Sequence, residues 1–400
     1  NTAPVFPPGF TNTRTTKLFD MMNIANLVNY LSVRVIIADT DDTRKNFYWY
    51  RDTLGSGEWY VLPWDKDLSF GVVGDANPWA GHPFQGDYAH RKVNGSHQWN
   101  YIWEAAFNEP KIRDMMLRRL RTLMDTQLGT AAGAPEALAD AFWAPIMATS
   151  PLPTSFNGAT NTGLKSYFTA RRSGALNAAG ISGLYTVYSA ANGLGAGLQI
   201  PTAQPANVTV GIGTVDYLPA SGNQDEEFVQ ITNANSYDVD ISGWELKRGV
   251  EHKFEYGTVV RANDVMYVAA KKTAFRARSV SPKGGEQLCI QGGYKGPISA
   301  RGEIIELWDP VDPVITTDDR LVTTINTPAN PTPAQQALRI TEIMYDPPAG
   351  GAFAAGEYEF IELTNTGLTS LSLTGATFTD GIDFTFGAVT LAPGERIVLA

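Results

Sequence analysis

An internal repeat in the second half of this 400-residue chain constrains its fold more than any other feature. The segment EEFVQITNANSYDVDISGWEL (226–246) aligns with YEFIELTNTGLTSLSLTGATF (358–378). In both copies a strand-like run ends in Thr-Asn, and a polar gap then leads to a second short run that enters a Ser/Thr-Gly turn. Short β runs separated by turns are typical of small sandwiches, so the repeat predicts two copies of one β domain.

The part before residue 200 has a different character, because apolar residues there recur at helical spacing. We therefore expect a multidomain chain, with an α+β region followed by all-β, immunoglobulin-like sandwiches. The predicted boundaries are an α+β domain at 1–178, a linker at 179–204, a first sandwich at 205–310, a Pro- and Thr-rich linker at 311–337 and a second sandwich at 338–400.

The second copy ends before the counterparts of the first copy's strands around Gln287–Ile290 and Glu303–Trp308. A sandwich without these strands exposes a sheet edge and part of its apolar face. We therefore expect 338–400 to be incomplete, and to need strands from more chain or from a neighbouring subunit. The chain also begins with Asn rather than Met, so we expect a fragment or a processed product.

Composition excludes several classes of function. The net charge of −10, without a long Lys/Arg block, argues against nucleic acid as the main partner. A single cysteine, Cys289, excludes an intrachain disulfide and a cysteine-based zinc site. No apolar run approaches the ~18 residues of a membrane span.

Local patterns predict the elements of the first region. KLFDMMNIANLVNYLS (17–32) has the apolar spacing of a helix, and the β-branched VRVIIAD (33–39) follows as a short strand. NFYWYRD and EWYVLPWD are aromatic-rich strands joined by an LGSG hairpin turn. A later helix begins near Pro110, with Asn108 or Glu109 as its N-cap.

The stretch from Asp41 to Gly71 carries the pattern with the most chemical content. Asn46 follows Asp41 by five residues, and the predicted hairpin then leads to Asp65 and Asp67. Kinase-type phosphotransferases use one carboxylate to address the substrate hydroxyl, and an Asn and a later Asp to hold Mg²⁺. The pattern therefore makes Asp41 a candidate catalytic residue and Asn46, Asp65 and Asp67 candidate metal ligands.

Each of these assignments has an alternative. Asp42 is nearly equivalent to Asp41, because a slip of one residue exchanges them. Asp and Asn also cap turns, so the whole pattern can be a local backbone feature. Asp67 can either assist Asp65 or cap the Ser-Phe-Gly turn that follows it, whereas Asp39 is expected to be a solvated turn residue.

Two other groups of residues have side chains that can bind a metal. His82, His90 and His97 lie in one loop at spacings that fit no zinc pattern, so we expect them to face water. Acidic residues in the β domains have the ligand type of Ca²⁺ but lack the alternation of an EF-hand loop, which leaves calcium as the weaker alternative. These residues are Asp225, Glu226, Glu227, Asp346, Glu357 and Glu359.

The strings NFYWYRD, EWYVLPWDKDLSFG and NEPKIRDMMLRRLRTLM resemble the CotH family of spore-coat protein kinases, over roughly residues 1–175. The resemblance implies an atypical kinase with a C-lobe-like fold, with ATP and Mg²⁺ or Mn²⁺ as cofactors and Ser/Thr of a protein as substrate. It also implies that Asp65 in the Trp-Asp-x-Asp motif is the Mg²⁺ ligand, with Asp67 beside it.

This sequence departs from a complete kinase in one respect. A kinase also needs an N-lobe with a phosphate-covering Gly-rich loop and a strand Lys. Neither pattern precedes Asp41, so the nucleotide-binding residues stay unknown, and we expect activity only if an N-lobe is supplied upstream of residue 1. The alternative is a non-catalytic surface or adhesion protein that uses these modules as a scaffold.

The repeated domains resemble lamin tail domains. FVQITN with ISGW (241–244) fits their pattern, and FIELTN with LTGA (373–376) fits it except that Ala376 replaces the Trp. Bacterial surface proteins often join CotH-like and lamin-tail-like modules. The resemblance therefore implies a secreted or cell-surface bacterial protein, whose partner is a protein substrate or a surface or matrix protein.

Overall fold

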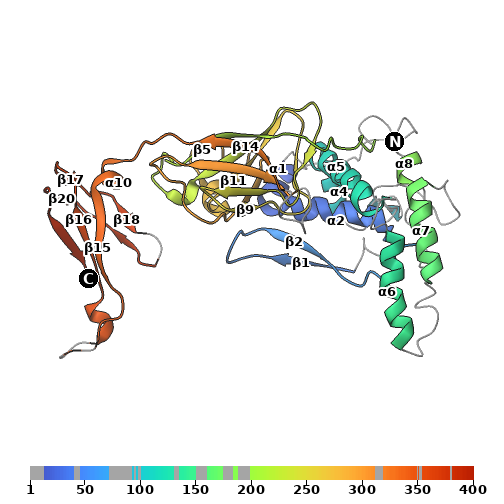
Figure 1. Cartoon of the computed structure of the whole chain (residues 1–400), viewed down its shortest axis with the longest axis horizontal. Coiled ribbons are helices and arrows are strands. Elements are labelled where there is room, and N and C mark those ends of the chain that lie inside the picture. Colours follow the sequence, from blue (N-terminus) through green and yellow to red (C-terminus); the bar gives the residue numbers. More distant parts are fainter. Residues whose placement is uncertain are drawn as a thin grey trace. The chain divides into compact units, whose positions relative to one another are not determined.

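A computed structural model describes residues 13–39, 46–71, 92–93, 96–97, 101–129, 135–149, 160–173, 183–187, 199–310, 319–348, 350, 354–378 and 381–400. The chain forms two compact units. The first comprises Asn1–Pro297 with Ile305–Ile325, and the second comprises Ile298–Ile304 with Asn326–Ala400. Helices dominate the N-terminal region and antiparallel strands the C-terminal region (Figure 1), which confirms the predicted α+β region followed by β domains.

The N-terminal region of the first unit combines helices with a β-hairpin (Figure 1). Its helices are α1 (Thr13–Met21), α2 (Ile24–Ile37), α4 (Tyr101–Asn108), α5 (Pro110–Gln127), α6 (Pro135–Thr149), α7 (Asn161–Ser173) and α8 (Leu184–Val187). Strands β1 (Phe47–Arg51) and β2 (Trp59–Pro63) form the predicted antiparallel hairpin, and β3 (Lys92–Val93) pairs with β4 (Ser96–His97).

Helix α2 corrects one prediction. The 17–32 pattern is split into two helices at Asn23, whose side chain caps α2 by accepting from the Asn26 N–H, and α2 then continues through the segment predicted as a strand. Val35 is fully buried one turn beyond Leu31, so packing outweighs the β propensity of this segment. Helix α5 begins as predicted, with Glu109 as its N-cap.

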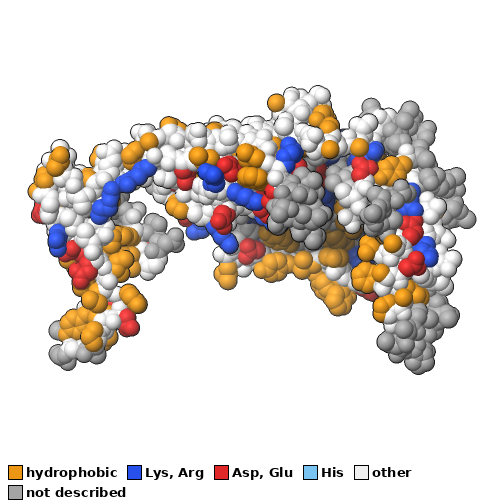
Figure 2. Space-filling model, in the orientation of Figure 1, with side chains coloured by type: hydrophobic (Ala, Val, Ile, Leu, Met, Phe, Trp, Pro, Cys, Tyr) orange, Lys and Arg blue, Asp and Glu red, His pale blue; other side chains and the backbone are white. Residues whose placement is uncertain are grey.

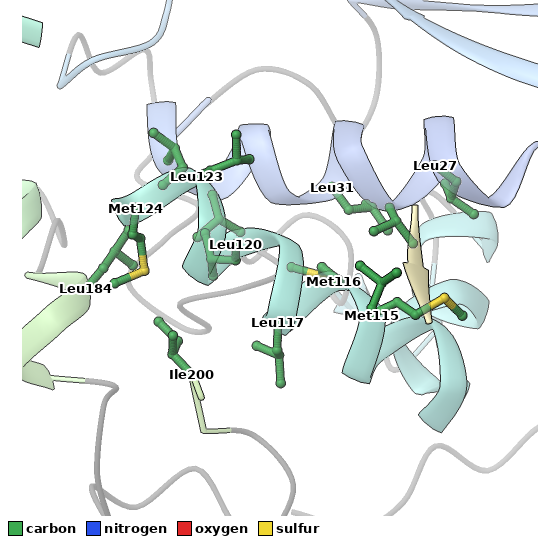
Figure 3. Close-up of a cluster of buried hydrophobic side chains, with 14 of the residues drawn as sticks. Leu27, Leu31, Met115, Met116, Leu117, Leu120, Leu123, Met124, Leu184 and Ile200 are labelled. Carbon is green, nitrogen blue, oxygen red and sulfur yellow. The ribbon is translucent and has the colours of Figure 1, made fainter. Parts of the chain in front are cut away.

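The core of this region lies between α2 and α5, which run side by side. Figure 3 shows Leu27 and Leu31 of α2 directed at Met115 and Met116 of α5, and all four side chains are buried. Ser32 Oγ, also buried, donates to the Met116 carbonyl at 3.0 Å. Close packing and a satisfied polar group make this helix pair the rigid base of the region.

The first sandwich comprises two four-stranded sheets and a separate strand pair. Its elements are β5 (Gly211–Asp216), η1 (Gln224–Glu226), β6 (Phe228–Asn233), β7 (Val239–Asp240), β8 (Glu245–Arg248), β9 (His252–Lys253), β10 (Val259–Val260), β11 (Asp264–Ala269), α9 (Lys272–Ala277), β12 (Cys289–Gly292), β13 (Ile304–Asp309) and β14 (Arg320–Asn326). The sheet orders are β12-β11-β6-β5 and β14-β13-β8-β9, and β7 pairs with β10. Strand β14 forms within the segment expected to be a linker.

The second unit has a smaller sandwich. Its elements are α10 (Pro333–Ala337), β15 (Leu338–Met344), η3 (Ala355–Tyr358), β16 (Phe360–Asn365), β17 (Leu371–Ser372), β18 (Thr377–Phe378), β19 (Phe384–Thr385), β20 (Thr390–Leu391) and β21 (Arg396–Leu399). Strands β15-β16-β21 form one sheet, and β17–β20 and β18–β19 form pairs. Its core is built from Leu363, Leu371, Leu373, Phe386 and Leu391.

The repeated Thr-Asn motif has the same structural role in both copies. The buried Asn233 side chain ends β6, and Asn365 is its counterpart at the end of β16. Each Nδ2 donates to three backbone carbonyls at 2.9 to 3.1 Å, those of Tyr237, Val260 and Arg261 in the first copy and of Thr369, Leu391 and Ala392 in the second. One buried amide thereby ties together two turns of each sandwich.

Candidate active site

The β1–β2 hairpin brings two predicted site residues to its open end. Phe47 pairs with Pro63, so Asn46 directly precedes the paired strands and Asp65 follows them by two residues. The Trp64 N–H donates to the Asn46 carbonyl at 3.2 Å. Asn46 (φ 66°) and Asp65 (φ 51°) both adopt the left-handed backbone conformation that Asn and Asp tolerate. The structure therefore places Asn46 and Asp65 at the same end of one hairpin.

The Trp-Asp-Lys-Asp segment after β2 alternates in direction. Asp65 and Asp67 are exposed to solvent, whereas Lys66 between them is half-buried and forms an ion pair with Asp39 at 2.6 Å. The Lys66 ammonium also lies 5.6 Å from the centroid of the Tyr30 ring. Alternation thus presents both carboxylates outward while the lysine fastens the segment to the end of α2.

Asp39 differs from its prediction. It was expected to be solvated, but its side chain is only 1% exposed because it follows a buried turn of α2 and is covered by Lys66. The loop is also fastened to α2 and α7, since the Phe70 N–H donates to the Ile37 carbonyl at 2.7 Å and the Phe70 ring packs edge-on against Tyr167. The segment from Lys66 to Phe70, which contains Asp67, is therefore held at both of its ends.

Asp41 and Asp42 lie outside the described residues, so their assignment stays a prediction. The residues on either side of them, Asp39 and Asn46, both contact the segment from Trp64 to Lys66. The described residues Asp39 and Asn46 are thus both connected to the segment that carries Asp65.

A cavity of about 150 Å³ lies behind this site. It is lined by Asn26, Asn29, Tyr30, Val33, Arg34, Ile37, Asp39, Val61, Pro63 and Lys66. Ligand pockets are usually about 300 to 1,000 Å³, so the cavity has room for a few waters but not for a nucleotide. A nucleotide that uses Asp65 and Asp67 would have to bind on the exposed side of the hairpin.

That exposed side is aromatic. Strand alternation directs Val61 into the core and leaves Tyr48, Tyr50, Leu62 and Trp64 exposed on the outer face. Figure 2 shows hydrophobic side chains gathered over the hairpin. The Trp64 ring meets the Tyr48 ring edge-on, with 5.5 Å between centroids. An apolar strip therefore leads directly to Asp65.

The donors at the open end suit a hard cation. Carboxylate oxygens of Asp65 and Asp67 and the amide oxygen of Asn46 are the ligand type that Mg²⁺ and Mn²⁺ take. In the part of the chain that the structure describes, no three His, Cys, Asp or Glu side chains gather as a metal-binding group. His82 and His90 fall outside that part, and His97 ends β4.

Sequence reasoning missed two charged residues around the hairpin. Lys66 could have been found from the alternation of the Trp-Asp-Lys-Asp string, which directs the lysine away from its two acidic neighbours. Glu58 lies at the turn end of the hairpin and is 1% exposed, where it is paired with Lys272 and Arg276. No local pattern could have indicated these partners, because they are more than 200 residues away along the chain.

The fold and the site together define a modular protein, in which a helical region with an acidic hairpin site precedes two β-sandwiches. Residues 11–156 match the family described as CotH kinase protein, and residues 203–317 and 331–400 both match the Lamin Tail Domain. The chain therefore carries a CotH-family region followed by two lamin tail domains. The curated proteins include no match to it. None of the helices in the described ranges has the length and hydrophobicity to cross a membrane.

Proposed function

We propose that the CotH-family region transfers the γ-phosphoryl group of ATP to a Ser or Thr hydroxyl of a protein substrate. One observation carries this proposal. The hairpin unites Asn46 and Asp65 at one end, and the Lys66–Asp39 ion pair connects that end to the segment that leads into Asp41. This is the order of parts that kinase chemistry requires, with a hydroxyl-directed carboxylate followed by an Asn and an Asp for the metal.

Each residue then has a role in the proposed reaction. Asp65 and Asn46 would hold Mg²⁺ or Mn²⁺, with Asp67 assisting from its exposed position. The metal, when bound, supplies positive charge against the phosphates of ATP. Asp41, or Asp42 in its place, would orient the substrate hydroxyl and accept its proton. Lys66 and Asp39 would keep the acidic loop in place without touching the substrate.

The proposal also requires residues that cover the nucleotide. The described residues before Asp41 form α1 and α2, and sequence 1–40 contains neither a Gly-rich loop nor a strand Lys. The residues that would cover the nucleotide therefore stay unassigned. Secretion to the cell surface, a bacterial source and calcium in the β domains remain proposals that rest on resemblance or on residue type alone.

A scaffold function is the second candidate. The observation that favours it is the buried set of ion pairs, described below, that fastens the first lamin tail domain to the CotH-family region. Such a rigid two-domain body would suit a surface or adhesion protein that binds another surface or matrix protein without catalysis.

Phosphate transfer from γ-labelled ATP, with Mg²⁺ or Mn²⁺ and a Ser/Thr-rich protein acceptor, tests the two candidates. We expect Asp65→Ala to abolish metal-dependent nucleotide binding in titration calorimetry, and to reduce transfer by about 100-fold or more. The matched control is Asp140→Asn, which removes an exposed carboxylate of α6 that pairs with Lys165. Wild-type binding by Asp65→Ala would refute the assignment. Absence of nucleotide binding in a longer chain that includes the residues upstream of Asn1 would favour the scaffold.

A further inference from the structure

The turn end of the β1–β2 hairpin is held by the first lamin tail domain. Lys272 of α9 donates to Glu58 Oε2 at 2.6 Å, and Arg276 donates to Oε1 at 2.5 Å. Asn23, the N-cap of α2, donates to Oε2 at 3.3 Å. We call Glu58, Lys272, Arg276 and Asn23 the Glu58 cluster. It joins α9 of the sandwich to the hairpin and to the start of α2.

The Glu58 cluster is shielded from water. The side chains of Glu58, Lys272 and Arg276 are 2%, 6% and 13% exposed. Removing one partner of a buried ion pair leaves the other charge desolvated and uncompensated, so the position of the hairpin depends on α9. The next residue, Trp59, also contributes, because its carbonyl accepts from the Asn23 N–H at 2.9 Å.

A second, independent contact brings the backbone of the sandwich directly against the backbone of α2. Gly257 of the sandwich has φ +97°, and a Cβ at this position would lie 2.1 Å from the Ala25 carbonyl oxygen and 2.8 Å from the Asn29 nitrogen. Both atoms belong to the backbone of α2, so no side chain can move aside. Only glycine permits this approach.

The remaining contacts extend the same interface along α5. Arg119 forms an ion pair with Asp240 at 3.2 Å, with both side chains buried, and Asp114 forms one with Arg261 at 2.9 Å. Val259 of β10 belongs to the same buried apolar cluster as the α2–α5 core. The sandwich therefore adds Val259 to the core of the CotH-family region and forms several ion pairs with that region, while Phe228, Tyr267 and Phe275 build a separate core within the sandwich.

We propose that the first lamin tail domain is a structural part of the candidate active site, and that it holds the hairpin bearing Asn46 and Asp65 through the Glu58 cluster and the Gly257 contact. Lys272 is a positioning residue in this assignment. The link to catalysis rests on the proposed phosphotransfer, whereas the mechanical link between sandwich and hairpin does not.

Hydrogen exchange of the full chain tests the mechanical link without an activity assay. Lys272→Met should accelerate exchange of the amides in 47–63 by at least about tenfold, because the buried Glu58 then loses a partner. The matched control is the neighbouring Lys271→Met, which removes an exposed lysine paired with Asp225 within the sandwich and should change those rates less than twofold. Lys272→Arg should restore slow exchange. Equal rates in the Met variants would overturn the proposal.

A second pair of variants keeps the test decisive if Lys272→Met fails to fold. Gly257→Ala should accelerate exchange in both 47–63 and α2, whereas Gly222→Ala has a similar φ of +79° with nothing near its Cβ and should affect neither. Equal exchange in these two variants would refute the contact. If the hairpin loosens as expected but a longer chain that includes the residues upstream of Asn1 binds no metal–nucleotide complex, the mechanical link stands and the proposed function fails.

Discussion

The two lamin tail domains share a sequence motif but differ in what surrounds them. In the first copy, β12 extends one sheet and β13 and β14 extend the other, and the sandwich adds Val259 to the core of α2 and α5. In the second copy, the described residues from 338 onward form strands β15 to β21 and the short helix η3. The repeated motif thus determines the local sandwich, whereas strands and partners outside the motif determine how well its faces are covered.

The exposed residues of the second copy show the consequence. Ile340 pairs in register with Leu363, yet Ile340 is 50% exposed and Leu363 only 2%. Ile343 is 57% exposed on the same strand. A strand added to 338–400 by another polypeptide could cover these apolar side chains. Such strand addition remains a proposal.

The largest effect on stability is expected at the Asn of the Thr-Asn motif, which has the same hydrogen bonds in both copies. Asn233→Ala and Asn365→Ala should each lower the unfolding free energy of their own sandwich by about 3 kcal/mol. The two amide N–H groups, and the amide oxygen that accepts from the Asn235 or the Gly367 N–H, together lose about three hydrogen bonds at roughly 1 kcal/mol each. Chemical denaturation followed by domain-specific hydrogen exchange measures both. A large loss in only one copy would mean that the shared motif does not have a shared role.

A difference of at least about 1 kcal/mol should separate covered from uncovered positions within the second copy. Leu363→Ala should cost about 2 to 4 kcal/mol, whereas Ile340→Ala should cost under about 1 kcal/mol because half of its side chain already faces water. Urea denaturation of the full chain, read out by exchange in β16, measures both variants. If the two substitutions prove equally costly, then Ile340 is covered in solution.

The smallest effect concerns pH at the interface of the first copy. Burial raises the pKa of Glu255, a half-buried carboxyl that accepts from Asn23. A carboxyl whose pKa is raised on folding contributes stability below its unfolded pKa of about 4.3, and that stability is lost as the pH rises through the folded pKa. At pH 7 the buried negative charge of Glu255 therefore lowers the free energy of unfolding.

Glu255→Gln should consequently raise the melting temperature by a degree or two at pH 7 and lose this advantage below about pH 4. The glutamine keeps an oxygen for Asn23 but carries no charge. Calorimetry at both pH values gives the comparison, with the exposed Glu251→Gln as control. The same gain at both pH values would contradict a cause based on charge burial.

The sequence predicted those parts of the molecule that depend on local pattern. The repeat, the β1–β2 hairpin and the start of α5 at Pro110 all follow from spacing, turn residues and capping. The predictions that proved wrong did so because of contacts between residues that are distant in sequence. Residues 33–37 are helical because Val35 is buried against the core, and Asp39 is buried because Lys66, distant in sequence, covers it.

The candidate site likewise has one part that follows from local pattern and one part that depends on the fold. Asn46 and Asp65 could be predicted because a hairpin brings its own two ends together, whatever the rest of the chain does. The Glu58 cluster could not, because its partners come from a different domain and no sequence periodicity connects them. Long-range ion pairs are visible only after the fold is known.

We infer that the CotH-family region and the first lamin tail domain unfold as one cooperative body, separately from the second domain. Hydrogen exchange of the full chain at increasing denaturant tests it most directly. Amides of α5 and β6 should merge into one opening transition with the same free energy, while those of β16 should open in another. Separate transitions for α5 and β6 would contradict the claim, because they would show that the first sandwich opens without the helical region.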